Sequence, residues 1–321
     1  MKKGYLYIIL ATFFFSSMEI ALKISAGTYN PIQLTFLRFL IGALVLLPLA
    51  MREIRKKQIS FCFSDWKFFS LTGFICVVIS MILYQLGIVF SKASVVAVLF
   101  SCNSVFVVLF AYLLLAEKIY RHTILSIVIS VAGMLVIINP AHLSGNAAGI
   151  VFSIGAAITF ALYNVIGRTR SGRYGGIVLT CFSFLFGCAE MLIFIAVTHI
   201  PAAADWFTGV GFSMFANVPV LAGIQPSSLP GLIYVGIFVT GLGYTFYFRA
   251  MEETSAATAS LVFYIKPVLA PIFAFIVLKE PITMQMSIGI LLIIIGSFLS
   301  FIPGIRLKKA NGKRKSLSED I

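Results

Sequence analysis

Stretches of about 20 mostly apolar residues follow one another along the whole chain, separated by short polar connections. An α-helix needs roughly 20 apolar residues to cross the hydrocarbon layer of a bilayer. The stretches lack the alternation of apolar and polar residues that marks the strands of a membrane β-barrel. The pattern therefore predicts ten transmembrane helices, over residues 4–24, 32–51, 67–90, 94–116, 121–139, 146–167, 174–199, 230–251, 255–278 and 283–303.

Composition agrees with an all-α integral membrane protein. Of the 321 residues, 60% are hydrophobic and only 11% are charged, and the mean hydropathy is +1.05, well outside the range of ordinary soluble domains. A net charge of +13 could suggest a nucleic-acid partner, but the basic residues lie in short segments between the apolar stretches. They indicate membrane topology instead, so we expect contact with membrane lipids and no nucleic acid.

The distribution of lysine and arginine predicts which way the chain crosses the membrane. With the N-terminus inside, 19 of the 24 basic residues fall in inside segments and three fall outside, which leaves Arg38 and Lys266 within spans. Such a bias predicts a multi-pass protein of the cell (inner) membrane with both termini in the cytoplasm. The start "MKKGYLYIILATFFFSS" also has the regions of a signal peptide, but a similar pattern recurs at residues 149–168, which favours a retained span.

An internal repeat relates the two halves of the chain. When the chain is slid over itself until Tyr84 meets Tyr247, "YQLGIVFSKASVVAVLF" aligns with "YFRAMEETSAATASLVF", and Glu117 pairs with Glu280. We call this alignment the late register, because it matches the later spans of each half.

A second alignment matches the first spans of each half. It places Gly4 on Gly149 and pairs Lys23 with Arg168, and we call it the early register. Each half holds five predicted spans, an odd number, so the second half enters the membrane from the opposite side. Inverted repeats of this kind are typical of secondary transporters, whose site lies near the midplane.

The predicted units are therefore a first repeat over residues 4–139, a second repeat over 146–303 and a basic cytoplasmic tail over 304–321. The tail, with the segment "RLKKANGKRKS", suits anionic lipid headgroups, although a solvated tail that only fixes topology is an alternative. The long connection at 200–229 is rich in glycine and proline, so it predicts either an interfacial helix on the outer face or a surface loop.

Three sequence segments carry a resemblance to a known family. The segments "LTFLRFLIGALVLLP", "FAYLLLAEK" and "FAFIVLKEP" resemble the EamA branch of the drug/metabolite transporter superfamily over residues 4–303. Arg38 and the Glu117/Glu280 pair match the family, whereas the tryptophan common in its first span is replaced here by "FFFSS".

The resemblance implies a secondary-active exporter of small metabolites such as amino acids or related carboxylate-bearing solutes, which works by alternating access. An uptake carrier or a nucleotide-sugar-type exchanger is an alternative, and an intramembrane enzyme or a channel is a further one. The sequence favours none of the enzymatic alternatives, because it has no P-loop, "GLGYTF" at 241–246 breaks the dinucleotide pattern, and its three histidines are scattered. We therefore expect no catalytic residues, metal or cofactor.

Lys266 is the first candidate for solute binding, because it lies near the middle of a predicted span. A lysine at the bilayer centre costs at least ~2.5 kcal/mol, so it must face protein or water. Pro267 and Pro271 leave helix carbonyls without amide donors nearby. The late register pairs Lys266 with Asn103, so both halves place a polar group near mid-depth. A kinked helix in which Lys266 only neutralises Glu190 is the alternative.

Three charged residues are candidates for gating or proton-linked roles. Glu19 and Arg38 lie at similar depth on sequential spans, which predicts a salt bridge that is either structural or part of the pathway. Glu190 lies at a depth close to that of Lys266, so it either carries a proton or neutralises the lysine.

Tyrosines within the spans are the last candidates. Aromatic belts place tyrosine at the membrane interfaces, so hydroxyls within spans indicate either a cavity wall or general core packing. We expect Tyr84, Tyr163, Tyr247 and Tyr264 to contribute to solute binding. Glu117 and Glu280, at the ends of predicted spans, are expected to cap the next helix or to anchor loops.

Overall fold

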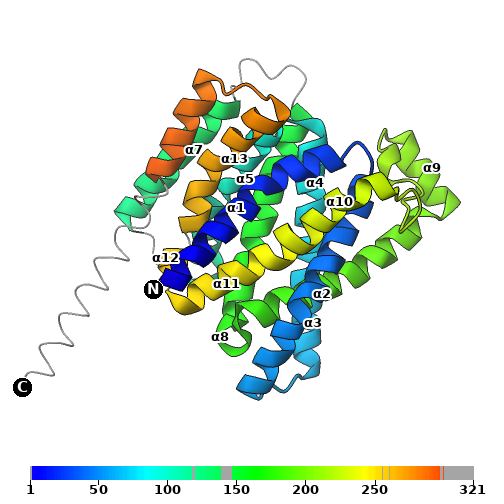
Figure 1. Cartoon of the computed structure of the whole chain (residues 1–321), viewed down its shortest axis with the longest axis horizontal. Helices are drawn as coiled ribbons and strands as arrows, with labels where there is room; N and C mark the ends of the chain where they lie inside the picture. The colour runs from blue at the N-terminus through cyan, green and yellow to red at the C-terminus, as the bar shows by residue number, and fades with distance from the viewer. Residues whose placement is uncertain are drawn as a thin grey trace, which may run out of the picture.

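The structure is a computed structural model that describes residues 2–117, 120–138, 147–254, 256–259, 261–296 and 299. Every regular element in this part of the chain is helical (Figure 1). The elements of the first half are α1 (Lys2–Ser25), α2 (Pro31–Lys57), α3 (Phe63–Gly73), the π-helix η1 (Phe74–Ser80), α4 (Met81–Phe90), α5 (Ala93–Ser101), α6 (Asn103–Leu115) and α7 (Arg121–Ile138).

The second half begins with one long bent helix and continues with shorter elements. They are α8 (Ala147–Thr198), α9 (Pro201–Gly209), the 3-10 turns η3 (Ser213–Phe215) and η4 (Pro226–Ser228), α10 (Leu229–Ile233), the π-helix η5 (Tyr234–Leu242), α11 (Gly243–Glu253), α12 (Ala256–Ala259), α13 (Leu261–Leu278) and a helix over Met284–Gly296. The predicted tail, residues 304–321, lies outside the described residues.

The helices confirm an all-α membrane protein. Seven helical stretches in the described residues are long and apolar enough to cross a bilayer, and Thr123–Ile138 and Met284–Gly296 are shorter apolar helices. The longest stretch, α8, is interrupted at Gly175, where φ is 77° and ψ is 166°. Because a side chain is strained at such a φ, glycine allows the chain to reverse there. The number of ten spans stays a prediction.

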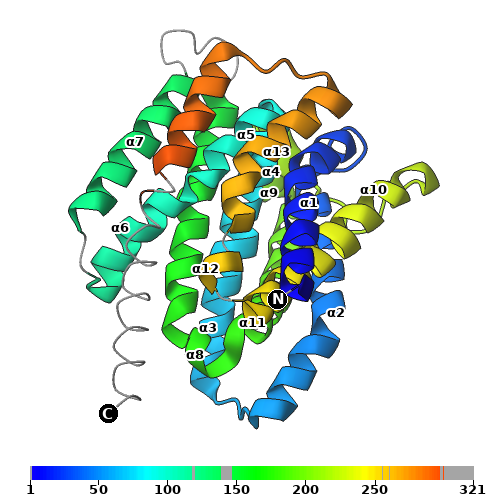
Figure 2. The ribbon, with the colours of Figure 1, turned by 60° about the vertical axis from the view of Figure 1, so that its left-hand side comes forward.

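The helices form one bundle with two distinct faces. Figure 2 shows the start of α1, the α2–α3 connection and the bend of α8 toward its lower end, and the end of α13 at its upper end. The lower end carries Lys57, Arg170 and Arg173 and is called the basic face here. The other end, where α1 and α13 finish and α5 begins, is called the opposite face.

Close helix packing follows the internal repeat. A Cβ atom on Gly73 of α3 would lie 2.6 Å from the backbone nitrogen of Gly187 of α8, so the two helices approach through their glycines. The late register carries Gly73 to Gly236, and the early register carries Gly187 back to Gly42. There η5 meets α2, and a Cβ atom on Gly42 would lie 2.9 Å from the Cβ atom of Thr240. The first repeat therefore packs against the second in two matched places.

Two π-helical segments occupy matched positions as well. The late register moves η1, residues 74–80, onto residues 237–243, which overlap η5 over 234–242. In η5 the hydroxyl of Thr240 donates to the carbonyl of Val235 five residues earlier. Single π-helical segments within α-helices are frequent at functional sites.

The segment 200–229 contains a short helix and packs on the start of α2. α9 lies at the edge of the bundle in Figure 1. The side chain of Asn30 donates to the carbonyl of Met214 over 2.8 Å, and that of Gln33 donates to the carbonyl of Ala222 over 2.9 Å. These bonds hold the segment against the start of α2.

Candidate solute-binding cavity

A cavity of about 650 Å³ lies between the two halves of the bundle. Its walls come from α5 and α6 of the first half and from α8, α11 and α13 of the second half. Lys266 and Phe100 lie at its deep end, and Arg168, Ser171 and Gly175 line it at the basic face. The volume is within the range of ~300–1,000 Å³ typical of small-molecule sites.

The cavity contains five of the six residues predicted to bind solute. Lys266, Asn103, Tyr163, Tyr247 and Tyr264 all line it, and several phenylalanines contribute to a wall that is mostly apolar. Convergent hydroxyl, amide and ammonium groups on an aromatic surface suit a small solute that has both polar and apolar parts.

Tyr84 is the predicted residue that does not line the cavity. Its side chain is fully buried, and its hydroxyl donates to Oε1 of Glu19 over 2.5 Å. Its position on α4 turns it toward α1, so it supports a charged group behind the cavity wall instead of facing a solute.

Lys266 pairs with Glu19. Lys266 Nζ lies 2.7 Å from Glu19 Oε1, and the two side chains are 5% and 0% exposed. The ammonium group also lies 5.4 Å from the ring centre of Phe100. A buried cation of this kind is tolerated because a carboxylate compensates its charge.

The alternative partner that sequence reasoning offered for Lys266 is wrong. Glu190 instead accepts a hydrogen bond of 2.5 Å from the hydroxyl of Ser70 on α3. The sequence predicted a similar depth in the membrane for Lys266 and Glu190, but the carboxylate of Glu190 is directed to another helix.

The predicted salt bridge between Glu19 and Arg38 is wrong as well. In the described part of the chain no carboxylate lies within 4.0 Å of the Arg38 guanidinium. That group contacts the sulfur atoms of Met18 and Met81 at 3.7 and 3.4 Å and lies 4.5 Å from the ring centre of Phe39. Arg38 is 1% exposed, so it is a buried cation whose hydrogen-bond partners among the described residues are two weak sulfur acceptors.

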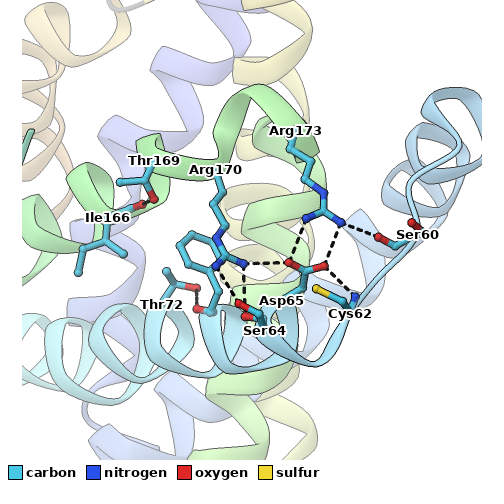
Figure 3. Close-up of polar contacts among 10 residues, drawn as sticks. Ser60, Cys62, Ser64, Asp65, Thr72, Ile166, Thr169, Arg170 and Arg173 are labelled. Carbon is cyan, nitrogen blue, oxygen red and sulfur yellow. Dashed lines mark hydrogen bonds and ion pairs between the residues drawn. The ribbon is translucent and has the colours of Figure 1, made fainter.

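A cluster on the basic face holds the bend of α8 in place. Figure 3 shows Arg170 and Arg173 pointing toward Asp65 at the start of α3. The ion-pair distances are 2.8 and 3.1 Å, and the Asp65 side chain is fully buried. Asp65 also accepts from the backbone N–H of Cys62, and Arg173 donates to the carbonyl of Ser60. Sequence reasoning missed this cluster, although the aspartate at the first turn of a helix and the arginines of "RTRSGR" were visible signals.

Glu117 and Glu280 have different partners. Glu280 accepts from the backbone N–H groups of Ala93 and Ser94 at 2.9 and 3.0 Å and from the Ser94 hydroxyl. It therefore caps α5, a helix far away in the sequence, and not the helix that follows it. Glu117 forms an ion pair of 2.8 Å with Arg168.

The fold and the cavity define the class of protein. A bundle of apolar helices around a cavity with a few convergent polar groups and a buried ion pair fits a multi-pass membrane transporter. The EamA-like transporter family matches the chain twice, over residues 2–139 and over residues 147–302. The chain belongs to this family.

Relatives and a solved structure agree with this assignment. A protein of Clostridium kluyveri named "Uncharacterized transporter" is 40% identical and covers 98% of this chain and 97% of its own length. An "Uncharacterized transporter" of Archaeoglobus fulgidus is 24% identical over 92% of this chain and 98% of its own. A crystal structure of a protein 17% identical in sequence has a TM-score of 0.61 over 96% of this chain and 99% of that chain, which supports the fold alone. As a transporter of this family, the chain has a small-molecule solute and membrane lipids as partners.

Proposed function

We propose that the protein is a secondary-active carrier that exports amino acids or related carboxylate-bearing metabolites by alternating access. The observation that carries the proposal is Lys266, a buried cation in the wall of a solute-sized cavity. A lysine has three N–H donors, and one of them is directed at Glu19. The remaining donors are available to a solute carboxylate in the cavity.

The charge balance of the site favours a zwitterion over a simple anion. The Lys266–Glu19 pair is neutral and Arg38 does not line the cavity, so a simple anion at this pair would add an uncompensated charge at the cavity wall. A zwitterionic amino acid keeps the site neutral. Its carboxylate would lie at Lys266 while its ammonium group contacts aromatic faces and hydroxyls such as Tyr264 and Tyr247.

Glu19, Arg38 and Glu190 keep their proposed places in gating or proton coupling. Oε2 of Glu19 and Oε2 of Glu190 are buried and have no hydrogen-bond partner among the described residues. Each carboxylate therefore has an oxygen to which a proton can add without breaking an existing bond.

We propose that the basic face is cytoplasmic, that the protein lies in the cell (inner) membrane and that both termini are on the cytoplasmic side. The excess of lysine and arginine in alternate connections supports this orientation. Since the cavity reaches the basic face at Arg168 and Ser171, the structure then has the solute site open to the cytoplasm. An exporter loads its solute in this state.

We propose that residues 4–139 and 146–303 are inverted repeats, each of five spans. Support comes from the two separate family matches, from the matched glycine contacts and from the two π-helical segments at equivalent positions. A site between the repeats explains why Lys266 and its repeat mate Asn103 both line the cavity.

A binding screen tests this proposal on the purified full-length protein. Zwitterionic amino acids, monocarboxylates and primary amines of similar size are compared for the rise in melting temperature that each produces, because a bound solute stabilises the folded state in proportion to ln(1 + [L]/Kd). We expect stabilisation by zwitterions, its loss in Lys266→Ala and partial retention in Lys266→Arg.

Lys67→Ala is the matched control, because Lys67 is an exposed lysine that lies outside the cavity. Stabilisation by amines alone, or an equal response in Lys266→Ala and the control, would contradict the assignment of Lys266.

A further inference from the structure

On the opposite face, two charged residues clamp the connection between α4 and α5. Lys23 of α1 donates through Nζ to the carbonyls of Ile88 and Ser91 at 2.6 and 2.7 Å and to that of Val89 at 3.3 Å. Glu280, which follows α13, accepts from the N–H groups of residues 93 and 94. A cation thus binds the end of one helix and a carboxylate binds the start of the next, which is the favourable sense for both helix dipoles. We call Lys23 and Glu280 the opposite-face latch.

The repeat mates of these two residues lie on the basic face but are engaged differently. The early register carries Lys23 to Arg168, and the late register carries Glu280 back to Glu117. The side chains of Arg168 and Glu117 bind each other at 2.8 Å and are 51% and 48% exposed. In the structure described here they are thus engaged with each other, whereas Lys23 and Glu280 hold a connection between helices. In the late register, the connection between α4 and α5 corresponds to residues 251–257.

Helix packing around the two connections is otherwise matched. A Cβ atom on Gly149 of α8 would lie 2.6 Å from the Cβ atom of Ser91. A Cβ atom on the repeat mate Gly4 of α1 would lie 2.4 Å from a methyl carbon of Thr254, the repeat mate of Ser91. Each connection therefore rests on the first helix of the other half, and the two faces differ in their charged contacts.

The cavity reaches the basic face, where the charged residues do not hold the connection between the helices. Arg168 on α8 and Met251 on α11 both line it at the basic face. Their repeat mates on the opposite face are Lys23 and Ile88, which are joined there by a hydrogen bond of 2.6 Å. Neither Lys23 nor Ile88 is among the residues that line the cavity, so the cavity reaches the face where the latch is not formed.

We propose that Arg168 and Glu117 form a second latch, which closes the basic face when the opposite face opens. In that state Arg168 donates to the carbonyls of residues 251, 252 and 254, and Glu117 accepts from the N–H groups of residues 256 and 257. These atoms are the repeat mates of the atoms that Lys23 and Glu280 bind now. The inference rests on the proposed alternating access, but it does not depend on the identity of the solute.

The test measures which face is open, with no solute present. Full-length protein in vesicles carries one of two introduced cysteine reporters, Asn164→Cys on the cavity wall or Ser91→Cys at the opposite-face latch, where the serine is 5% exposed. The background is Cys62→Ser, because Cys62 is exposed and the other four cysteines are buried. A membrane-impermeant maleimide is added to one side of the membrane at a time, and the labelling rate of each reporter is recorded.

Loss of one latch should open the face that this latch holds closed, and the reporter of that face should then be labelled faster. We expect Glu280→Gln to lower the labelling rate of Asn164→Cys and to raise that of Ser91→Cys. The ratio of the two rates should change by about tenfold, because hydrogen bonds to a charged group are lost. Ser94→Ala removes a single hydrogen bond to Glu280, so it should act in the same direction with smaller size. Glu117→Gln should favour the open basic face, and its combination with Glu280→Gln should return the ratio toward that of the parent protein.

Glu53→Gln is the matched control, because Glu53 is a basic-face carboxylate whose ion partner is Lys57 of the same helix. Equal shifts in Glu280→Gln and Glu53→Gln, or shifts of the same sign in Glu280→Gln and Glu117→Gln, would overturn the second latch. A failed solute screen would leave these labelling results intact, so the two proposals fail separately.

Discussion

Removal of Lys266 should destabilise the protein through the carboxylate that it leaves behind. In Lys266→Ala, Glu19 stays fully buried, and the hydroxyl of Tyr84 is the one hydrogen-bond partner that it keeps among the described residues. Breaking a buried ion pair by removing one partner costs ~3–5 kcal/mol of unfolding free energy.

A double-mutant cycle measures this coupling. Glu19→Gln keeps an oxygen that accepts from Tyr84 and removes the buried charge, so Lys266→Ala combined with Glu19→Gln should recover most of the stability lost in Lys266→Ala. The assay is the unfolding of each variant in the same detergent, followed by melting temperature and by denaturant titration.

A control cycle combines Lys266→Ala with Glu190→Gln instead of Glu19→Gln. The carboxylate of Glu190 binds Ser70 and not the lysine. Glu190→Gln should add its effect to that of Lys266→Ala without rescue. Equal rescue by both glutamine variants, or none by Glu19→Gln, would refute the assignment of Glu19 as the partner of Lys266.

Three further predictions concern packing, the basic face and the buried arginine. Gly73→Ala should destabilise the protein by ~1–3 kcal/mol, because its Cβ atom would lie 2.5 Å from a backbone oxygen of α8. The control Gly172→Ala meets nothing within 4 Å and should be close to neutral in a thermal melt. Asp65→Asn removes the charge that holds two arginines and should lower stability by ~1.5–3 kcal/mol. Glu53→Gln breaks a partly exposed pair within one helix turn and should cost less than ~1 kcal/mol; equal melting temperatures would contradict the role of the cluster. Arg38→Met should lower solute flux while it keeps or raises the melting temperature, because the arginine has no carboxylate partner in the described residues; normal flux would show that the charge has no part in transport.

Much of the fold could be predicted from the sequence because two features recur along the chain. They are apolar stretches long enough to span a membrane and glycines at equivalent positions in the two halves. The late register predicted that Lys266 and Asn103 occupy equivalent places, and both line the cavity. Pro267 beside the lysine also lies in the cavity wall. These predictions depend on position along a helix, which sequence gives well.

The partners of the charged residues could not be read in the same way. Spacing along a helix gives depth in the membrane, whereas pairing depends on the direction in which each side chain leaves its helix. Glu19 was therefore expected to pair with Arg38 but pairs with Lys266, which lies in the other half of the chain. Tyr84 was placed in the cavity, yet its helix turns it toward Glu19.

The most direct measurement of the central claim is solute exchange by the purified protein in proteoliposomes. A zwitterionic amino acid identified by the thermal screen is compared with its carboxamide, which keeps the ammonium group and the shape but lacks the carboxylate. We expect saturable exchange of the amino acid by the parent protein and by Lys67→Ala, little exchange of the carboxamide, and loss of amino-acid exchange in a folded Lys266→Ala/Glu19→Gln variant. Normal amino-acid exchange by that variant, or equal exchange of the amino acid and its carboxamide by the parent protein, would contradict the role of Lys266 as the carboxylate site.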